Sequence, residues 1–178
     1  NISVAGVSDG LCGADRPGHF DGVATVVCKL FNQVRPDLAF FGEKDWQQLA
    51  VIRRMARDLD LVLPHADAIY GVPIAREADG LAMSSRNAYL STEQRSIAAA
   101  LPRAMREAIA RLSIGNAAEP VLADLARHLI DSGFDTVDYA ELRHGDNLVP
   151  ATAVAPGTRL FVAARIGGTR LIDNMAAD

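Results

Sequence analysis

The stretch FGEKDWQQ, which begins at residue 41, joins residue types that can bind a nucleotide where a predicted strand gives way to a predicted helix. In open α/β sheets, ligands bind outside the carboxyl ends of the strands, and the first turn of a helix presents free N–H groups to an anion. Lys44 can neutralise a phosphate, and Asp45 can accept hydrogen bonds from a ribose. The alternative is structural, because Asp45 and Gln48 also have the spacing of a helix capping box and Lys44 can be a solvated loop lysine.

A second candidate is the stretch GLAMSSRN, inside a long segment without periodicity. The hydroxyls of Ser84 and Ser85 and the guanidinium of Arg86 form a compact set of donors for phosphate oxygens. In the alternative, the polar side chains only cap and turn the chain, while Arg86 pairs with a carboxylate, Glu77 or Asp79. The pattern alone leaves both interpretations open.

The histidines offer a weaker candidate. His19 follows the sequence R-P-G before a predicted helix and can act as a general base, but a lone histidine there is also typical of a cap or a packed residue. The other three histidines stand apart from one another, and neither they nor Cys12 and Cys28 have the spacing of metal ligands. No metal site built from protein ligands is predicted.

Helices and strands alternate over the first part of the chain, and this order predicts a parallel sheet. The apolar spacing predicts helices over residues 20–31 and 46–59 and buried strands over residues 38–41 and 67–72, while the first residues, NISVAG, look like a further strand. Short links between these elements favour a right-handed crossover and an open α/β sheet. In the first helix the apolar side chains at helical spacing are Val23, Val26, Val27, Leu30 and Phe31. In the second, the side chains expected to cover the sheet are Leu49, Ile52, Ala56 and Leu59.

A different pattern follows Pro73. The sequence S-T-E-Q at Ser91 is a capping box and begins an amphipathic helix that is expected to run to Leu112, with a kink or break at Pro102. A second amphipathic helix opens at Glu119. Its inward side chains are expected to be Val121, Leu122, Leu125, Leu129 and Ile130.

Three β-like stretches end the chain, at residues 136–143, 159–166 and 169–174, and a Gly-Gly pair between the last two is a hairpin signal. The chain is therefore predicted to contain an α/β part, residues 1–74, and a small α+β domain with an antiparallel sheet, residues 75–178.

Composition excludes several classes of protein. The chain has 178 residues, 49% of them hydrophobic, and a formal net charge of −4, which excludes a disordered chain and bulk nucleic-acid binding. It has no apolar stretch near the roughly 18 residues that a bilayer requires. A cytoplasmic protein without a nucleic-acid or membrane partner is expected.

Five motifs, in order and spacing, resemble the pantoate–β-alanine ligase (pantothenate synthetase) family. They are RPGHF from residue 16, FFGEKDWQQ from residue 40, GVPI from residue 71, DGLAMSSRN from residue 79 and LIDN from residue 171. The resemblance implies a Rossmann-like nucleotide domain followed by a lid domain, and a homodimer. It also implies ATP-dependent ligation with Mg²⁺, in which pantoate is adenylated and β-alanine then displaces AMP.

The resemblance also assigns roles to residues. ATP contacts are implied for the G-E-K-D turn, the M-S-S-R loop and one backbone position before that loop: Gly42, Glu43, Lys44, Asp45, Ala75, Met83, Ser84, Ser85 and Arg86. Within this set the implied catalytic groups are Lys44, Ser84, Ser85 and Arg86. Gln48, the second glutamine of Q-Q, is implied to hold pantoate.

One family motif is missing. The family begins with an H-x-G-H segment whose histidines stabilise phosphates, and this sequence has none, so the chain is interpreted as the carboxyl-terminal portion of the enzyme. Two alternatives follow: another adenylate-forming nucleotidyltransferase, and a non-catalytic nucleotide-binding or dimerisation module.

Overall fold

The computed structural model describes residues 1–177, and the chain divides into two compact units. Unit 1 comprises Asn1–Pro73 and Asp146–Leu148, and unit 2 comprises Ile74–Gly145 and Val149–Asp178. The division in the structure falls after Pro73, one residue before the predicted one, and the short Asp146–Leu148 segment of unit 1 was not anticipated. The roles given to the two parts, a nucleotide domain and a lid, stay predictions.

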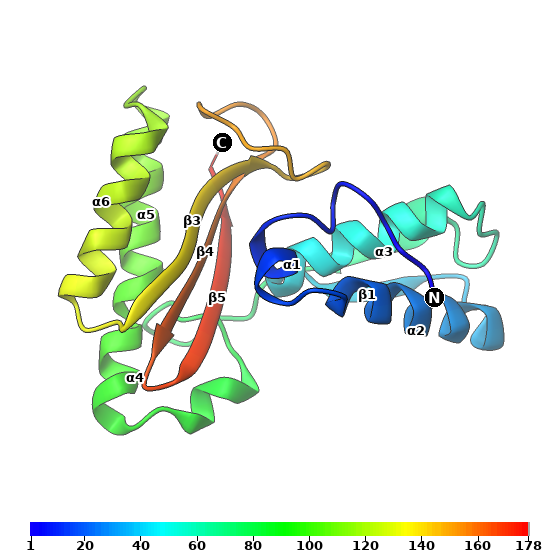
Figure 1. The fold of residues 1–178 in the computed structure, drawn as a ribbon, viewed down its shortest axis with the longest axis horizontal. Helices are drawn as coiled ribbons and strands as arrows, with labels where there is room; N and C mark the ends of the chain where they lie inside the picture. Colours follow the sequence, from blue (N-terminus) through cyan, green and yellow to red (C-terminus); the bar gives the residue numbers. More distant parts are fainter. Residues whose placement is uncertain (178) are drawn as a thin grey trace. The chain divides into compact units, whose positions relative to one another are not determined.

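Unit 1 is built on two parallel strands, which confirms the predicted α/β class. β1 (Ala39–Gly42) pairs with β2 (Ile69–Val72). The helices α2 (His19–Val34) and α3 (Trp46–Asp58) pack against each other, and α3 also contacts β1. Figure 1 shows these elements in blue to cyan. The shorter elements are α1 (Leu11–Asp15), η1 (Glu43–Asp45) and η2 (Ala66–Ala68).

The buried face of α2 differs from the apolar spacing of its sequence. Val26 and Leu30 belong to the apolar spacing from which the helix was predicted, but they are 56% and 50% exposed. The buried face consists of Phe20, Ala24, Cys28 and Phe31. Because two of these side chains are small, the helix can approach its neighbours closely, and a ranking by hydrophobicity alone does not reveal that requirement. In α3 the prediction holds except at Leu59, which follows the last helical residue and is 46% exposed.

Two predicted strand positions in unit 1 are wrong. Residues 1–10 contain turns in place of a strand, because Gly6 and Gly10 adopt positive φ angles of 81° and 65° that bend the chain. The strand expected from Asp67 begins at Ile69, since the Nδ1 atom of His65 accepts a hydrogen bond from the Asp67 N–H and caps the η2 turn.

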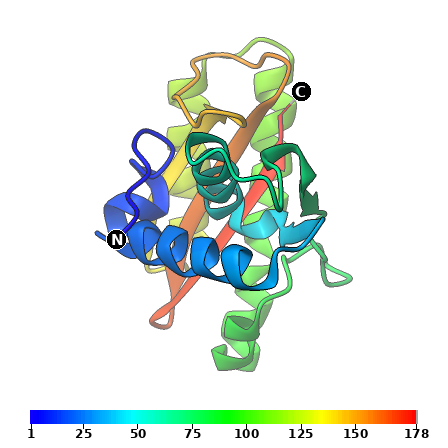
Figure 2. The same cartoon turned by 90° about the vertical axis from the view of Figure 1, so that its right-hand side faces the viewer.

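Unit 2 is an antiparallel three-stranded sheet covered by two helices, as predicted. The strand order is β3 (Thr136–His144), β4 (Thr158–Ile166) and β5 (Thr169–Ala176). α5 (Ala100–Ser113) and α6 (Ala118–Asp131) lie side by side, with α6 packed on β3 and α5 on β4 (Figure 1). Figure 2 shows this helix pair behind the orange and red strands. The hairpin at Gly167 and Gly168 is confirmed.

The predicted capping box and helix break in unit 2 are also confirmed. The Ser91 hydroxyl accepts from the Gln94 N–H and begins α4 (Thr92–Ala98). The break falls at Ala99, so Pro102 lies in the first turn of α5, where its missing N–H costs no helical hydrogen bond. Ile130 was expected to face inward but is 44% exposed, whereas Leu129 is fully buried.

Candidate functional site

The turn after β1 is the first part of the candidate site. Because β1 and β2 are parallel, their carboxyl ends lie at the same edge, where Gly42 is opposite Val72. The chain then forms the η1 turn over Glu43–Asp45 and enters α3 at Trp46. The turn therefore lies at the sheet edge where ligands of open α/β sheets bind.

Glu43 is oriented toward the neighbouring strand. A methyl group added at Gly71 of β2 would overlap the Glu43 side chain, so the absence of a side chain at Gly71 gives the carboxylate its place. The Arg53 guanidinium of α3 donates to the Ile69 carbonyl at 2.9 Å and ties the helix to the same strand. These contacts fix the turn from two sides.

The capping interpretation of Asp45 is wrong. Asp45 occupies the position before α3, but its side chain makes no capping hydrogen bond, and its φ and ψ of −94° and 54° are not those of an extended capping residue. Its carboxylate is exposed, and Lys44 and Gln48 are partly buried. Within residues 1–177 neither the Asp45 carboxylate nor the Gln48 amide takes part in a hydrogen bond, so both are available to a ligand.

The adjacent Gln47 is a residue that the sequence analysis missed. Its side chain is buried, and its amide N–H group donates to the Val7 carbonyl at 3.1 Å. Further contacts reach the carbonyls of Asp9 and Gly10, and the Gln47 oxygen accepts from the Cys12 N–H at 3.0 Å. Gln47 therefore holds the amino-terminal turns against α3. A glutamine inside the apolar face of a predicted helix is the signal that could have revealed it.

The M-S-S-R segment belongs to a closed loop of unit 2. Arg76 and Ala82 form an isolated antiparallel bridge, and the Met83 N–H donates to the Ala75 carbonyl at 2.9 Å. The η3 turn (Ser85–Tyr89) follows, capped by the Ser84 hydroxyl, which accepts from the Arg86 N–H at 3.2 Å. The capping role given to Ser84 in the alternative interpretation is therefore confirmed.

The ion pair proposed for Arg86 is wrong. The two candidate carboxylates bind Arg95 instead, with Asp79 at 2.6 Å and Glu77 at 3.7 Å from its guanidinium. The hydrogen bond from Arg95 lowers the pKa of Asp79, and the same contact raises the pKa of Arg95. In the part of the chain that the structure describes, the exposed side chains of Arg86 and Ser85 have no hydrogen-bond or ion-pair partner.

A buried ion pair beneath this loop was also missed. Arg76 donates to both oxygens of Asp173 of β5, at 2.7 and 2.9 Å, and the Asp173 side chain has no exposed surface. Asp173 is two residues from the buried Leu171, so strand alternation places it on a buried face. A charged residue at such a position is the signal that could have identified the pair.

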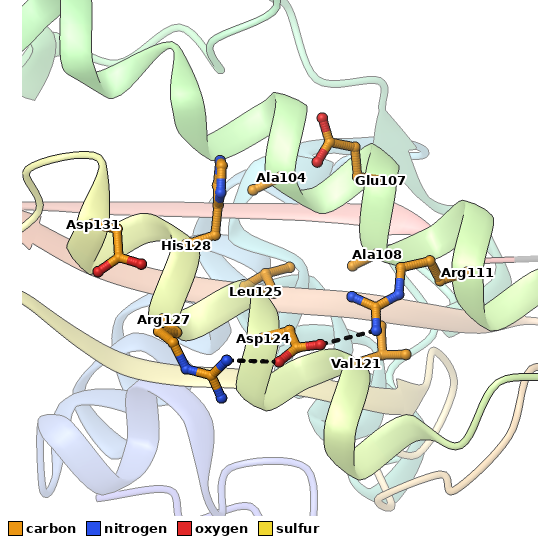
Figure 3. A pocket seen from close by; sticks show the side chains of 10 residues that line it. All are labelled: Ala104, Glu107, Ala108, Arg111, Val121, Asp124, Leu125, Arg127, His128 and Asp131. Carbon is orange, nitrogen blue, oxygen red and sulfur yellow. Dashed lines mark hydrogen bonds and ion pairs between the residues drawn. The ribbon is translucent and has the colours of Figure 1, made fainter.

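Other candidates contribute little to either group. His19 is the first residue of α2, with its ring centroid 5.0 Å from that of Phe20. Among residues 1–177, no group of three or more His, Cys, Asp or Glu side chains is arranged to hold a metal ion. Figure 3 shows a pocket of about 350 Å³ between α5 and α6, where Asp124 pairs with Arg111 and Arg127; none of the predicted site residues lines it.

The predicted site residues thus form two groups, each within its own unit. Unit 1 holds Gly42, Glu43, Lys44, Asp45 and Gln48, around the η1 turn and the start of α3. Unit 2 holds Ala75, Met83, Ser84, Ser85 and Arg86, in the closed loop and the start of η3. Each of these two sets of residues combines polar side chains suited to anion binding with a defined backbone turn.

Comparison with known proteins agrees with these motifs. Residues 1–176 match the profile of the family described as Pantoate-beta-alanine ligase. The chain is 63% identical over 176 residues to the pantothenate synthetase of Novosphingobium aromaticivorans, and 57% identical over 175 residues to that of Sphingopyxis alaskensis. These alignments cover 98% of this chain in both cases, and 62% and 61% of the two relatives. The chain therefore spans less than two thirds of the length of these relatives.

Solved structures give the same result. The crystal structure of pantothenate synthetase from Thermus thermophilus matches with a TM-score of 0.84 and 42% identity, over 98% of this chain and 62% of that one. The ligase of Francisella tularensis, complexed with β,γ-ATP and β-alanine, matches with a TM-score of 0.73 and 28% identity, over 99% of this chain and 57% of that one. None of the helices within residues 1–177 has the length and apolar composition that crossing a membrane requires.

Proposed function

Because the chain belongs to the pantoate–β-alanine ligase family, we propose that it forms the nucleotide- and pantoate-binding part of an enzyme that joins pantoate to β-alanine with ATP. The observation that carries the proposal is a set of polar side chains in motifs of that family that have no partner within residues 1–177: Gln48, Ser85 and Arg86. A folded chain that keeps such groups unpaired on defined turns is suited to bind an anionic ligand.

The proposed first step is adenylation. A pantoate carboxylate oxygen attacks the α-phosphorus of ATP, the bond to the β-phosphate oxygen breaks, and pyrophosphate leaves. Negative charge shifts onto the phosphate oxygens in this step, so cations and hydroxyl donors held in place lower its barrier. Lys44, Arg86 and the hydroxyls of Ser84 and Ser85 are the groups proposed to supply this stabilisation.

In the proposed second step the β-alanine amine attacks the acyl carbon of pantoyl adenylate, and AMP leaves with the electron pair of the broken acyl–oxygen bond. The intermediate must stay bound between the two steps. We assign the ribose to Asp45, pantoate to Gln48, and the adenine to Met83 and the backbone of Ala75. Gly42 and Glu43 complete the turn beside the nucleotide.

ATP is proposed to enter as its magnesium complex, so that the ion arrives on the phosphates. Among residues 1–177, no group of three or more His, Cys, Asp or Glu side chains is placed to hold the ion. The chemistry that the ion supplies is neutralisation of phosphate charge. This chain contributes the side chains that orient the phosphates.

The proposal includes a cytoplasmic homodimer. Its support in this chain is a set of apolar side chains that stay exposed in unit 1, among them Val26, Leu30, Phe40 and Tyr70, with the last two rings stacked at 5.7 Å. Contiguous exposed apolar side chains are typical of interaction surfaces, and the stacked Phe40 and Tyr70 rings form such a contact. Light scattering over a range of protein concentrations tests it: a constant monomer mass would contradict the dimer.

The decisive experiment is ATP–pyrophosphate exchange with Mg²⁺ and pantoate, on a sample whose intact mass has been recorded. We expect exchange that depends on pantoate. Exchange with a different acid alone would favour another adenylate-forming nucleotidyltransferase. A folded chain that binds ATP without any exchange would assign it the binding role only.

A further inference from the structure

The loop that carries the M-S-S-R segment is closed by its own backbone. Besides the Arg76–Ala82 bridge, the Glu77 N–H donates to the Leu81 carbonyl at 2.9 Å, and the Met83 N–H reaches Ala75 at the same distance. The Asn87 side-chain amide donates to the Ala82 carbonyl at 3.1 Å and closes the other side of the segment. Residues 83–86 are therefore held between two fixed points.

One guanidinium fixes this closed loop to the sheet. Arg76 donates to the Gly80 carbonyl across the loop at 3.0 Å, and to both carboxylate oxygens of Asp173 on β5, 97 residues further along the chain. The η3 turn that follows the segment also contacts β5. Because the guanidinium is planar and makes two bonds to one carboxylate, it fixes direction as well as distance.

Asp173 is in turn held in a single orientation. One of its oxygens accepts from the Asn174 N–H at 2.8 Å, and the Asn174 side-chain oxygen accepts two bonds from Arg159, at 3.0 and 2.8 Å. The Asp173 side chain is completely buried, whereas that of Arg76 is 24% exposed. An isolated buried carboxylate is strongly disfavoured, so the native position of Arg76 is the arrangement that satisfies it.

In the described part of the chain, Met83, Ser85 and Arg86 have exposed side chains. Met83 is 54% exposed, and Ser85 and Arg86 are exposed, with no partner for their polar side-chain groups among the described residues. The hydrogen-bonded loop is thus followed by the η3 turn, whose side-chain donors at Ser85 and Arg86 remain available within the described residues. Groups that stabilise developing charge act best when they are positioned before the reaction.

We propose that Arg76 and Asp173 are positioning residues for the nucleotide: their buried ion pair sets where Met83, Ser84, Ser85 and Arg86 meet the ATP phosphates. This inference rests on the proposed function. It assigns a role to the L-I-D-N motif and to the arginine before the loop, neither of which touches the nucleotide in the proposal. A shift of the loop of about 1 Å is enough to lower reactivity by roughly 100-fold.

Three variants, Asp173→Asn, Arg76→Lys and Arg76→Ala, and one matched control test the inference. Asp173→Asn keeps the shape of the side chain and removes its charge, and Arg76→Lys keeps the charge and removes the planar fork. The control is Asp138→Asn, which breaks a carboxylate–arginine network on the same sheet, with Arg165 at 3.0 Å and Arg170 at 2.7 Å; none of these three residues belongs to the loop. All variants are compared at temperatures that give equal folded fractions.

Two measurements are made on each variant. Amide hydrogen exchange at Glu77 and Met83, whose N–H groups close the loop, reports its fixation without any ligand. The ATP affinity, the pantoate affinity and the rate of pyrophosphate exchange report whether the loop contributes to nucleotide binding and adenylation. For Asp173→Asn we expect faster amide exchange at both positions. We also expect a 10- to 100-fold loss in reactivity with ATP, because a displacement of about 1 Å can cost roughly 100-fold. We expect Asp173→Asn to leave the pantoate affinity unchanged. For Arg76→Lys we expect changes in amide exchange and ATP reactivity that are smaller than those of Asp173→Asn.

The outcomes separate the two proposals. If the natural chain binds no ATP, the proposed function fails, and amide exchange still decides whether the ion pair fixes the loop. If Asp173→Asn and Asp138→Asn show the same amide exchange at Met83 and the same ATP affinity, the positioning role is overturned. Recovery of part of the ATP affinity in Arg76→Lys, relative to Arg76→Ala at equal folded fraction, supports the role.

Discussion

Two adjacent glutamines at the start of α3 have different environments. Gln47 is buried and hydrogen-bonded to the turns that precede α1, whereas Gln48 is partly buried and, within the described residues, makes no hydrogen bond. Buried polar groups are normally satisfied by the fold, and a satisfied group has little left to offer a ligand. Stability is therefore the expected role of Gln47, and binding that of Gln48.

Substitution of each glutamine separates these roles. Gln47→Ala removes the hydrogen bonds that its amide makes with the Cys12 N–H and the Val7 carbonyl, and each buried group that loses its bond costs about 1–3 kcal/mol in the free energy of unfolding. Gln48→Ala is expected to change stability little and to weaken pantoate binding by about tenfold. Urea unfolding and pantoate titration check the pair. Equal effects of both variants on stability would contradict this assignment.

The two lysines of the chain provide a second test at the residue scale. Lys44 lies in the η1 turn, and Lys29 is exposed on α2. We expect Lys44→Ala to weaken ATP binding by about 10- to 100-fold, because a charged hydrogen bond to a phosphate is lost, and Lys29→Ala to leave it unchanged. Calorimetric titration with ATP measures both. Unaltered affinity in Lys44→Ala would favour the non-catalytic alternative.

At the scale of elements, helical periodicity identifies an apolar stripe but not which of its edges is buried. In α6 the stripe includes both Leu129 and Ile130, yet Leu129 is fully buried and Ile130 is 44% exposed. Successive helical residues lie 100° apart, so only one of two neighbours can face the sheet. In α2 the same ambiguity applies to Val26 and Leu30, which belong to the apolar spacing but are exposed.

Truncation of Leu129 and of Ile130 on α6 to alanine is expected to lower the free energy of unfolding by different amounts. Leu129→Ala creates a cavity in the core of unit 2 and is expected to lower the free energy of unfolding by about 2–5 kcal/mol. Ile130→Ala removes a side chain from the surface and is expected to change it by about 0.5 kcal/mol at most. Chemical denaturation measures both values. Costs within about 1 kcal/mol of each other would contradict the observed burial, because the two expected ranges lie at least about 1.5 kcal/mol apart.

At the scale of the whole molecule, carboxylate–arginine pairs determine how stability depends on pH. Hydrogen bonding to Arg95 lowers the pKa of Asp79 from its ordinary 3.8. Burial by itself would raise the pKa of Asp138, but the hydrogen bonds from Arg170 and Arg165 outweigh burial and lower the pKa from 3.8. Both carboxylates therefore stay ionised in the folded chain at a pH where they are protonated in the unfolded chain.

The sign of the effect follows from proton binding. A lowered folded-state pKa gives stability that is complete above the unfolded value of 3.8 and is lost as the pH falls through the folded-state value. We expect the free energy of unfolding to decrease below pH 3.8, and to decrease less steeply in the Asp79→Asn, Asp138→Asn double variant. Urea unfolding at a series of pH values checks this. Parallel curves for the variant and the natural chain would exclude these pairs as the cause.

Apart from the first residues, the sequence by itself determined the order of the main helices and strands, the division into an α/β part and an α+β part, and the family, because periodicity, turn residues and long motifs are local properties of the chain. Tertiary structure alone decided which helix faces are buried and which polar side chains stay unpaired. Arg76 and Asp173 are 97 residues apart, and Gln47 is 35 residues from Cys12. No local pattern encodes such partners, because they meet only when packing brings distant segments together.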